Sequence, residues 1–121
     1  MNKKIYHLST CSTCNRILGE IQAEKKGFFL QDIKTEKITP AQLDELKEKT
    51  GSYEALFSRR AIKYKEMGLK DTPLTEKDYR RLILEEYTFL KRPVALIGNQ
   101  VFVGSDAKSV TGLKEALASK R

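Results

Sequence analysis

The first third of the chain alternates short apolar runs with one helical pattern. The stretch "KKIYHL" is rich in β-favouring residues and predicts a strand. The next stretch, "STCST", offers hydroxyl side chains that can cap a helix beginning at about residue 11 or 12. Apolar side chains follow at helical spacing at Cys14, Ile17, Leu18 and Ile21, and Gly27 is suited to end the helix. Because "FFLQDI" predicts a second strand, the segment should form a right-handed β-α-β unit with parallel strands.

The middle of the chain carries helical signals only. In "KITPAQLDEL", Thr39 is a suitable N-cap and Pro40 occupies the first helical position. The stretch "TGSYEALFS" predicts a break and a short helix, and "RRAIKYKEMGL" predicts a helix that stops at Gly68. In "TPLTEKDYRRLILEEY", Thr75 again resembles a cap. We therefore expect a helical insertion of three or four elements after the second strand.

The pattern changes after Arg92 and Pro93. The runs "VALIG" and "QVFVG" are apolar and β-branched, and Gly98-Asn99 between them predicts a β-hairpin. The final stretch, "SDAKSVTGLKEALASKR", has the periodicity of a helix, although Gly112 weakens that prediction. The expected order is β-α-β, helices, then β-β-α, which places the chain in the α/β class.

Composition and charge narrow the range of functions. The chain has 121 residues, enough for one domain with its own core, and 40% of them are hydrophobic. It has no apolar run of the roughly 20 residues needed to cross a bilayer and no long apolar leader, so we expect a cytoplasmic protein without a membrane partner. The net charge of +7 comes from basic residues interleaved with acidic ones, as in "AQLDELKEK". Such interleaving is typical of solvated helix faces, and we expect no direct contact with nucleic acid.

The two cysteines, Cys11 and Cys14, are the main chemical feature. A zinc ion would need four ligands, and the chain adds only one histidine, His7, so we expect no metal site. A reducing compartment disfavours a structural disulfide. A predicted strand-to-helix turn would place Cys11 at a helix N-terminus, where N–H groups and the helix dipole favour a thiolate. Cys14, three residues on, would be either a resolving thiol for disulfide exchange or a small core residue.

Three stretches together resemble a known family. In chain order they are "IYHLSTCSTCNRILGEI", "ALFSRRAIKYKEMGL" and "FLKRPVALIGNQVFVG", and they resemble the arsenate reductase (ArsC)/Spx family of thioredoxin-fold proteins. The resemblance implies one domain over residues 1–121. It has a thioredoxin-like core at about residues 1–38 and 90–121 and a helical subdomain at about 39–89. It also implies that Cys11 is the nucleophilic cysteine.

The resemblance implies roles for five further residues. Arg92, in "KRP", matches an anion-binding arginine, and Pro93 matches a proline that is typically cis and faces the cysteine loop. Arg60 matches an arginine of the Spx-type regulators, and the adjacent Arg59 is a weaker candidate for the same role. His7, also a weaker candidate, matches a histidine just before the cysteine loop in the reductases.

Two departures leave the branch of the family open. The reductases carry a third arginine on the last strand, where this chain has "QVFVGSD". They usually borrow glutathione as the second thiol, whereas this chain has its own Cys14, as Spx-type regulators do. One expectation is a thiol-dependent reductase of a small oxyanion or disulfide, in which Cys14 or glutathione resolves the Cys11 adduct. It would hold no tightly bound cofactor, and glutathione with glutaredoxin, or thioredoxin, would act as reductant and redoxin partner.

Two other functions stay open. One is an Spx-like regulator that binds the RNA polymerase α-subunit and senses oxidation through a redox-active Cys11–Cys14 disulfide. The other is a binding role with a degenerate site, in which the pKa of Cys11 would lie near the free value of about 8.5.

Overall fold

The computed structural model describes residues 3–118 of the chain. It divides into two compact units. One comprises Met1–Glu36 together with Arg92–Arg121, and the other is Lys37–Lys91. The sequence placed these boundaries at about residues 38–39 and 89–90. No helix within the described residues is long and apolar enough to cross a membrane.

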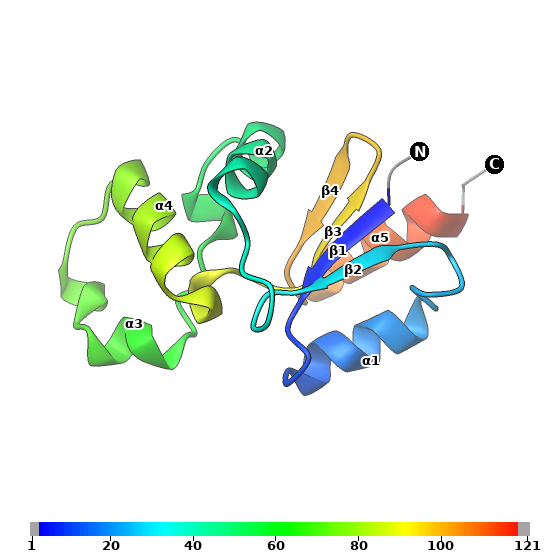
Figure 1. The fold of residues 1–121 in the computed structure, drawn as a ribbon, viewed down its shortest axis with the longest axis horizontal. Helices are drawn as coiled ribbons and strands as arrows, with labels where there is room; N and C mark the ends of the chain where they lie inside the picture. The colour runs from blue at the N-terminus through cyan, green and yellow to red at the C-terminus, as the bar shows by residue number, and fades with distance from the viewer. Residues whose placement is uncertain (1–2, 119–121) are drawn as a thin grey trace. The chain divides into compact units, whose positions relative to one another are not determined.

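The first unit is built on a sheet of four strands. They are β1 (Lys3–His7), β2 (Phe29–Asp32), β3 (Val94–Ile97) and β4 (Gln100–Val103), in the order β2-β1-β3-β4. Strands β1 and β2 are parallel, and the other two pairs are antiparallel. The predicted parallel β-α-β unit and the predicted hairpin are both confirmed, and β1 joins them at the centre of the sheet (Figure 1).

Helices α1 (Ser12–Glu20) and α5 (Ala107–Ala118) pack on one face of this sheet (Figure 1). The buried cluster between them joins side chains of β1, β3, α5 and the segment between α1 and β2: Ile5, Ala95, Ile97, Leu113, Ile21, Ala23 and Phe28. The last three residues of the predicted C-terminal helix lie outside the described residues. Because apolar burial contributes about 25 cal/mol per Å², this cluster stabilises the packing of the helices on the sheet.

Helix α1 ends earlier than the sequence predicted. Gln22 has a left-handed φ of 54°, and the N–H of Ala23 donates to the carbonyl of Leu18 over 3.1 Å, which closes the helix at Glu20. The chain then continues in turns to Gly27, whose φ is 83°. Gly27 therefore lies in the turn before β2, whereas the left-handed residue that follows the end of α1 is Gln22.

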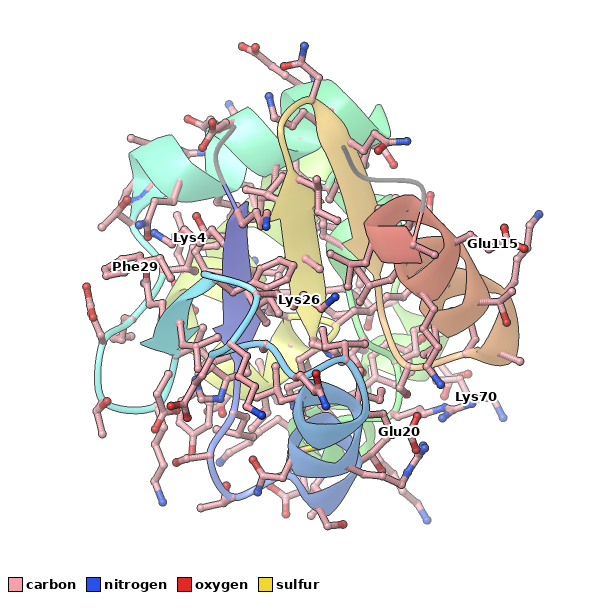
Figure 2. The ribbon with its side chains drawn as sticks, turned by 90° about the vertical axis from the view of Figure 1, so that its right-hand side faces the viewer. Lys4, Glu20, Lys26, Phe29, Lys70 and Glu115 are labelled. Carbon is pink, nitrogen blue, oxygen red and sulfur yellow. The ribbon has the colours of Figure 1, made fainter. Side chains whose placement is uncertain are left out.

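The other face of the sheet carries a cationic side chain between two aromatic rings. The Nζ of Lys4 lies 4.8 Å from the ring centroid of Tyr6 and 5.2 Å from that of Phe29. Figure 2 labels Lys4 and Phe29, which lie next to each other near the β2 edge. Phe29 is 62% exposed and Tyr6 is buried, so the lysine covers part of an apolar surface.

The second unit contains the predicted helical insertion. Its α-helices are α2 (Pro40–Thr50), α3 (Ile62–Glu66) and α4 (Glu76–Glu85), and its 3₁₀ turns are η1 (Glu54–Leu56), η2 (Leu69–Asp71) and η3 (Tyr87–Phe89). Thr39 and Thr75 cap α2 and α4 as predicted, each in a reciprocal capping box with the residue three positions on. The helix predicted from residue 59 begins later, at Ile62, because Ala61 is extended with a ψ of 139°. It stops before Gly68 as predicted, where the chain turns with a left-handed φ of 65°.

Aromatic side chains form the centre of the second unit. The ring of Phe57 stacks on Phe89 with the centroids 4.9 Å apart and lies 4.9 Å from Tyr79 and 6.0 Å from Tyr64. An ion pair ties α2 to α4, since Arg80 donates to both carboxylate oxygens of Asp44 over 2.8 and 3.2 Å. This unit thus has an aromatic core of its own.

Candidate functional site

The candidate site begins with a tight turn between β1 and α1. The N–H of Cys11 donates to the carbonyl of Leu8 over 2.9 Å, so residues 8–11 form a β-turn. Cys11 follows in an extended conformation, with φ −92° and ψ 109°, and is the N-cap of α1. The sequence predicted a strand-to-helix turn at these residues, and the structure confirms it.

The thiol of Cys11 takes the place of the usual capping hydroxyl. Its Sγ accepts a hydrogen bond from the backbone N–H of Cys14 over 3.4 Å, which is a normal length for sulfur. The first turn of a helix has free N–H groups and the positive end of the helix dipole. This position therefore stabilises a negative charge on the Cys11 sulfur more than it stabilises the neutral thiol.

The pKa of Cys11 is lowered from its ordinary value despite an opposing effect. Burial acts to raise the pKa. The backbone and side-chain hydrogen bonds from Cys14, the charge of Arg92 and the backbone hydrogen bond from Thr13 together outweigh it. The result is a partly accessible sulfur that loses its proton more readily than a free cysteine, as a nucleophile requires.

Cys14 has the opposite environment. Its side chain is fully buried on the core face of α1, and this burial raises the pKa of the thiol to about 12. The hydrogen bond and the charge of the neighbouring Cys11 contribute to this rise, and the backbone of Leu8 and the charge of Arg92 offset only part of it. At neutral pH, Cys14 is therefore a protonated thiol beside an activated one.

Arg92 and Pro93 lie directly before β3, in the same unit as the cysteines. The Arg92–Pro93 peptide bond is cis, the geometry that the family resemblance implied. The carbonyl of Pro93 accepts the N–H of Gly104 over 2.8 Å, which fixes the segment to the end of β4. The charge of Arg92 lowers the pKa of both thiols and so favours an anion at this turn.

His7 is the last residue of β1 and lines a cavity of about 460 Å³ beside α1. Asn15, Leu18 and Gln22 are among the other lining residues, and Cys11 is not. Within residues 3–118, the buried Nδ1 of His7 has no hydrogen-bond partner. His7 therefore precedes the cysteine loop in the sequence, but its side chain lines a cavity to which Cys11 does not contribute.

Arg59 and Arg60 belong to the helical unit. Arg59 donates to the carboxylate of Glu54 over 2.8 Å and to the hydroxyl of Tyr79 over 3.0 Å, so it already has a structural role. Arg60 is exposed, and its backbone N–H donates to the hydroxyl of Ser58 over 3.3 Å. The participation of either arginine in chemistry at Cys11 stays a prediction.

Two residues that the sequence analysis did not single out lie against the cysteine turn. The carboxylate of Asp32 accepts the N–H of Ser9 over 3.2 Å, and the side-chain amide of Asn15 donates to the carbonyl of Ser9 over 3.0 Å. A usable signal was present, because parallel strands end at the same edge of a sheet. Asp32 at the end of β2 pairs in register with His7 at the end of β1.

Among residues 3–118, no three histidine, cysteine or acidic side chains are placed to hold a metal ion.

The sequence matches a family model but no single curated protein. The model of the ArsC family matches residues 6–113. No curated protein sequence matches the chain significantly.

Several solved structures share the fold. An arsenate reductase from Vibrio cholerae is 20% identical with a TM-score of 0.77, and the match covers 93% of this chain and 97% of that one. A putative arsenate reductase from Yersinia pestis is 18% identical with a TM-score of 0.76, covering 92% and 99%. A putative ArsC family related protein from Bacteroides fragilis is 21% identical with a TM-score of 0.78, covering 93% and 98%. These likenesses confirm the predicted thioredoxin-like α/β fold with its helical insertion.

Proposed function

Because the chain belongs to the ArsC family, we propose that it is a cytoplasmic, thiol-dependent oxidoreductase of the arsenate reductase type with Cys11 as its nucleophile. The observation that carries the proposal is the capping position of the Cys11 sulfur. It accepts the N–H of Cys14 at the start of α1, has a lowered pKa and lies within the field of Arg92. Its substrate is a small oxyanion or a disulfide.

In the first step, the Cys11 thiolate attacks the electrophile. With an oxyanion, the sulfur bonds to the central atom and an oxygen leaves as water or hydroxide. With a mixed disulfide, the sulfur bonds to one sulfur and the other leaves as a thiolate. Arg92 offsets the repulsion between the thiolate and an anionic substrate, because a guanidinium keeps its charge and binds oxygen pairs bidentately.

In the second step, another thiol attacks the Cys11 sulfur. A disulfide forms, and the electron pair of the broken bond leaves with the substrate, which is thereby reduced by two electrons. Cys14 is suited to this step only after Cys11 has reacted. Burial is the largest cause of the raised pKa of Cys14 and persists, but the contribution of the negative charge on Cys11 ends once that sulfur carries an adduct. Glutathione is the other candidate, and glutathione with glutaredoxin, or thioredoxin, would restore the reduced protein.

Turnover with defined thiol systems tests the proposal. Arsenate and a mixed disulfide of glutathione would each be offered with the glutathione–glutaredoxin system and with the thioredoxin system. The proteins compared are the wild type, Cys11→Ser and Cys14→Ser. We expect Cys11→Ser to lose turnover of every substrate. If Cys14 resolves the adduct, Cys14→Ser loses turnover with thioredoxin. If the Cys14→Ser variant keeps full activity with glutathione, glutathione is the resolving thiol.

Two results would contradict the proposal. One is turnover by Cys11→Ser at the wild-type rate. The other is an absence of turnover by the folded wild-type protein with both substrates and both reducing systems. Weak arsenate turnover beside efficient disulfide turnover would instead agree with the sequence "QVFVGSD", which lacks a third arginine for the oxyanion.

The contact between the two thiols also suits a sensor. A second sulfur in hydrogen-bond contact with the first allows oxidation to be stored as a Cys11–Cys14 disulfide, as an Spx-like regulator of RNA polymerase would require. Its test is capture of the C-terminal domain of the polymerase α-subunit by the oxidised protein, with the reduced protein and Cys14→Ser as controls. Absence of capture, together with thiol-coupled turnover, would rule this function out.

A further inference from the structure

Ser9, the second residue of the cysteine turn, is held on both sides of its peptide backbone. Its N–H donates to Oδ1 of Asp32 over 3.2 Å. Its carbonyl accepts the side-chain amide of Asn15 over 3.0 Å. The two partners come from different elements, since Asp32 ends β2 and Asn15 lies in the first turn of α1. One residue of the turn is thus tied to the sheet and to the helix at once.

The Asp32 carboxylate is itself held in place. The same Oδ1 accepts the N–H of Lys34 over 3.2 Å, which closes a local turn after β2. The pKa of Asp32 is lowered, first by a hydrogen bond from the Ser9 side chain and then, against the effect of burial, by the N–H groups of Lys34 and Ser9 and by the charge of His7. Asp32 therefore presents a charged, pre-oriented acceptor to Ser9.

The position of Ser9 bears on the Cys11 sulfur through a short chain of bonds. The turn of residues 8–11 is closed by the Cys11 N–H on the carbonyl of Leu8 over 2.9 Å. Cys11 must then keep its extended capping conformation for Sγ to meet the N–H of Cys14 over 3.4 Å. If Ser9 were released, the turn could rotate away from α1, and the sulfur would lose the N–H groups that favour its charged form.

We propose that Asp32 and Asn15 are positioning residues which clamp Ser9 and thereby hold the Cys11 sulfur over the first turn of α1. The proposal rests on the proposed function only for its catalytic meaning, since the clamp acts on the free protein. We call this arrangement the Ser9 clamp, and it consists of Asp32, Asn15 and Ser9. Neither positioning residue is required to touch the substrate.

Charge and position predict opposite effects at Asp32. A carboxylate near the turn disfavours a second negative charge, so its removal alone would make the Cys11 thiolate easier to form. Loss of the clamp would make the thiolate harder to form. The charged and titratable groups in this environment are Cys14 and Arg92 beside Cys11, and His7 beside Asp32. The direction of the change therefore distinguishes the two effects.

The test is the rate of alkylation of Cys11 by iodoacetamide as a function of pH, with the modified residue identified by mass spectrometry. Cys14 does not interfere, because its pKa of about 12 keeps it protonated over the range measured. The variants are Asp32→Ala, Asp32→Asn and Asn15→Ala. Asp32→Ala and Asp32→Asn remove the same charge, but the asparagine oxygen can still accept both N–H groups. Glu36→Ala, an exposed acid in the same segment, is the charge control.

We expect Asp32→Ala and Asn15→Ala to slow alkylation at pH 7 by about three- to tenfold and to move the profile to higher pH. Asp32→Asn and Glu36→Ala should stay within about twofold of the wild type. A merely structural role would lower the thermal stability of Asp32→Ala and leave the pH profile unchanged. That result would overturn the proposal, as would equal slowing by Asp32→Asn or faster alkylation of Asp32→Ala.

Two further safeguards keep the test decisive. If Asp32→Ala does not fold, Asn15→Ala decides, because a wild-type profile in that variant overturns the clamp. The measurement needs no substrate. If the wild type turns over neither arsenate nor a disulfide while the alkylation pattern holds, the proposed function fails and the Ser9 clamp stands.

Discussion

At the scale of single residues, burial separates two chemically identical side chains. Cys11 and Cys14 are one helical turn apart and share the field of Arg92, yet the pKa of one is lowered and the pKa of the other rises to about 12. The difference arises because Cys11 receives the N–H groups at the start of α1, whereas Cys14 faces the core. A single turn of helix thus provides a reactive thiol and a reserve thiol.

The Arg92 side chain should set part of this reactivity. Its positive charge lowers the pKa of Cys11, so Arg92→Gln should move the alkylation profile of Cys11 to higher pH, and Arg92→Lys should restore much of the difference. Iodoacetamide rates between about pH 5 and 9 measure the effect. Arg16→Gln is the control, because this exposed arginine of α1, the helix that Cys11 caps, is paired with Glu20 over 2.7 Å. Coincident profiles for the wild type and Arg92→Gln would show that the arginine is not acting on the thiol.

At the scale of elements, the sequence predicted contacts between nearby residues better than contacts between residues far apart along the chain. Thr39 with Pro40, and Thr75, marked the starts of α2 and α4 because a cap is a contact between residues three apart. The end of α1 was missed, since Gln22 adopts a left-handed conformation that is usual for glycine. The contacts of Ser9 were missed for a different reason. Asp32 lies far along the chain, and only the parallel pairing of β1 with β2 brings it to the turn.

The ion pair between α2 and α4 should make stability depend on pH in the acid range. The hydrogen bond from Arg80, with that from Tyr53, lowers the pKa of Asp44 to about 2, below the unfolded value of about 3.9. A carboxyl with a lowered folded pKa stabilises the fold above its unfolded pKa, and the contribution is lost as pH falls through about 4 toward 2.

The variant Asp44→Asn isolates this contribution. The difference in free energy of unfolding between wild type and Asp44→Asn should shrink over that acid range, as urea titrations at successive pH values would measure. Because the side chains are 37% and 44% exposed, we expect a total of no more than about 1 kcal/mol. Arg80→Gln should remove most of the same pH dependence. A difference that stays constant with pH would contradict the assignment.

The glycine that weakened the prediction of the last helix has a packing reason. A Cβ at Gly112 would lie 3.1 Å from a ring carbon of Phe102, so the close contact of α5 with β4 favours a glycine. In a free helix, Gly→Ala would stabilise by about 1 kcal/mol. We expect Gly112→Ala to gain less than this in the wild type and more in the Phe102→Leu background, as chemical denaturation of the four proteins would show. Equal gains in both backgrounds would mean that the ring does not oppose the Cβ.

At the scale of the whole molecule, the chain builds the candidate site from its two ends. The cysteine turn comes from the first segment and Arg92 from the return of the chain after the helical unit, and β1 paired with β3 joins them. From the sequence, only the family resemblance predicted that Arg92 and the cysteine turn belong to one site. The pairing of β1 with β3 is a contact between distant segments, and hydrophobic periodicity does not encode which strand is its neighbour.

The net charge of +7 should act on the same site from a distance. A positive protein attracts anionic reagents, and salt screens this attraction with a length of about 10 Å at 0.1 M. We therefore expect the rate at which Cys11 attacks the anionic disulfide 5,5′-dithiobis(2-nitrobenzoate) to fall severalfold as NaCl rises from about 0.02 to 0.5 M. The neutral disulfide 4,4′-dithiodipyridine should react at a nearly constant rate, because it lacks the charge that salt would screen. Stopped-flow absorbance follows both reactions, since one releases a yellow thiolate and the other a thione that absorbs in the near ultraviolet. If both reagents showed the same salt dependence, the effect would lie in the thiolate itself and long-range attraction of anionic substrates would be excluded.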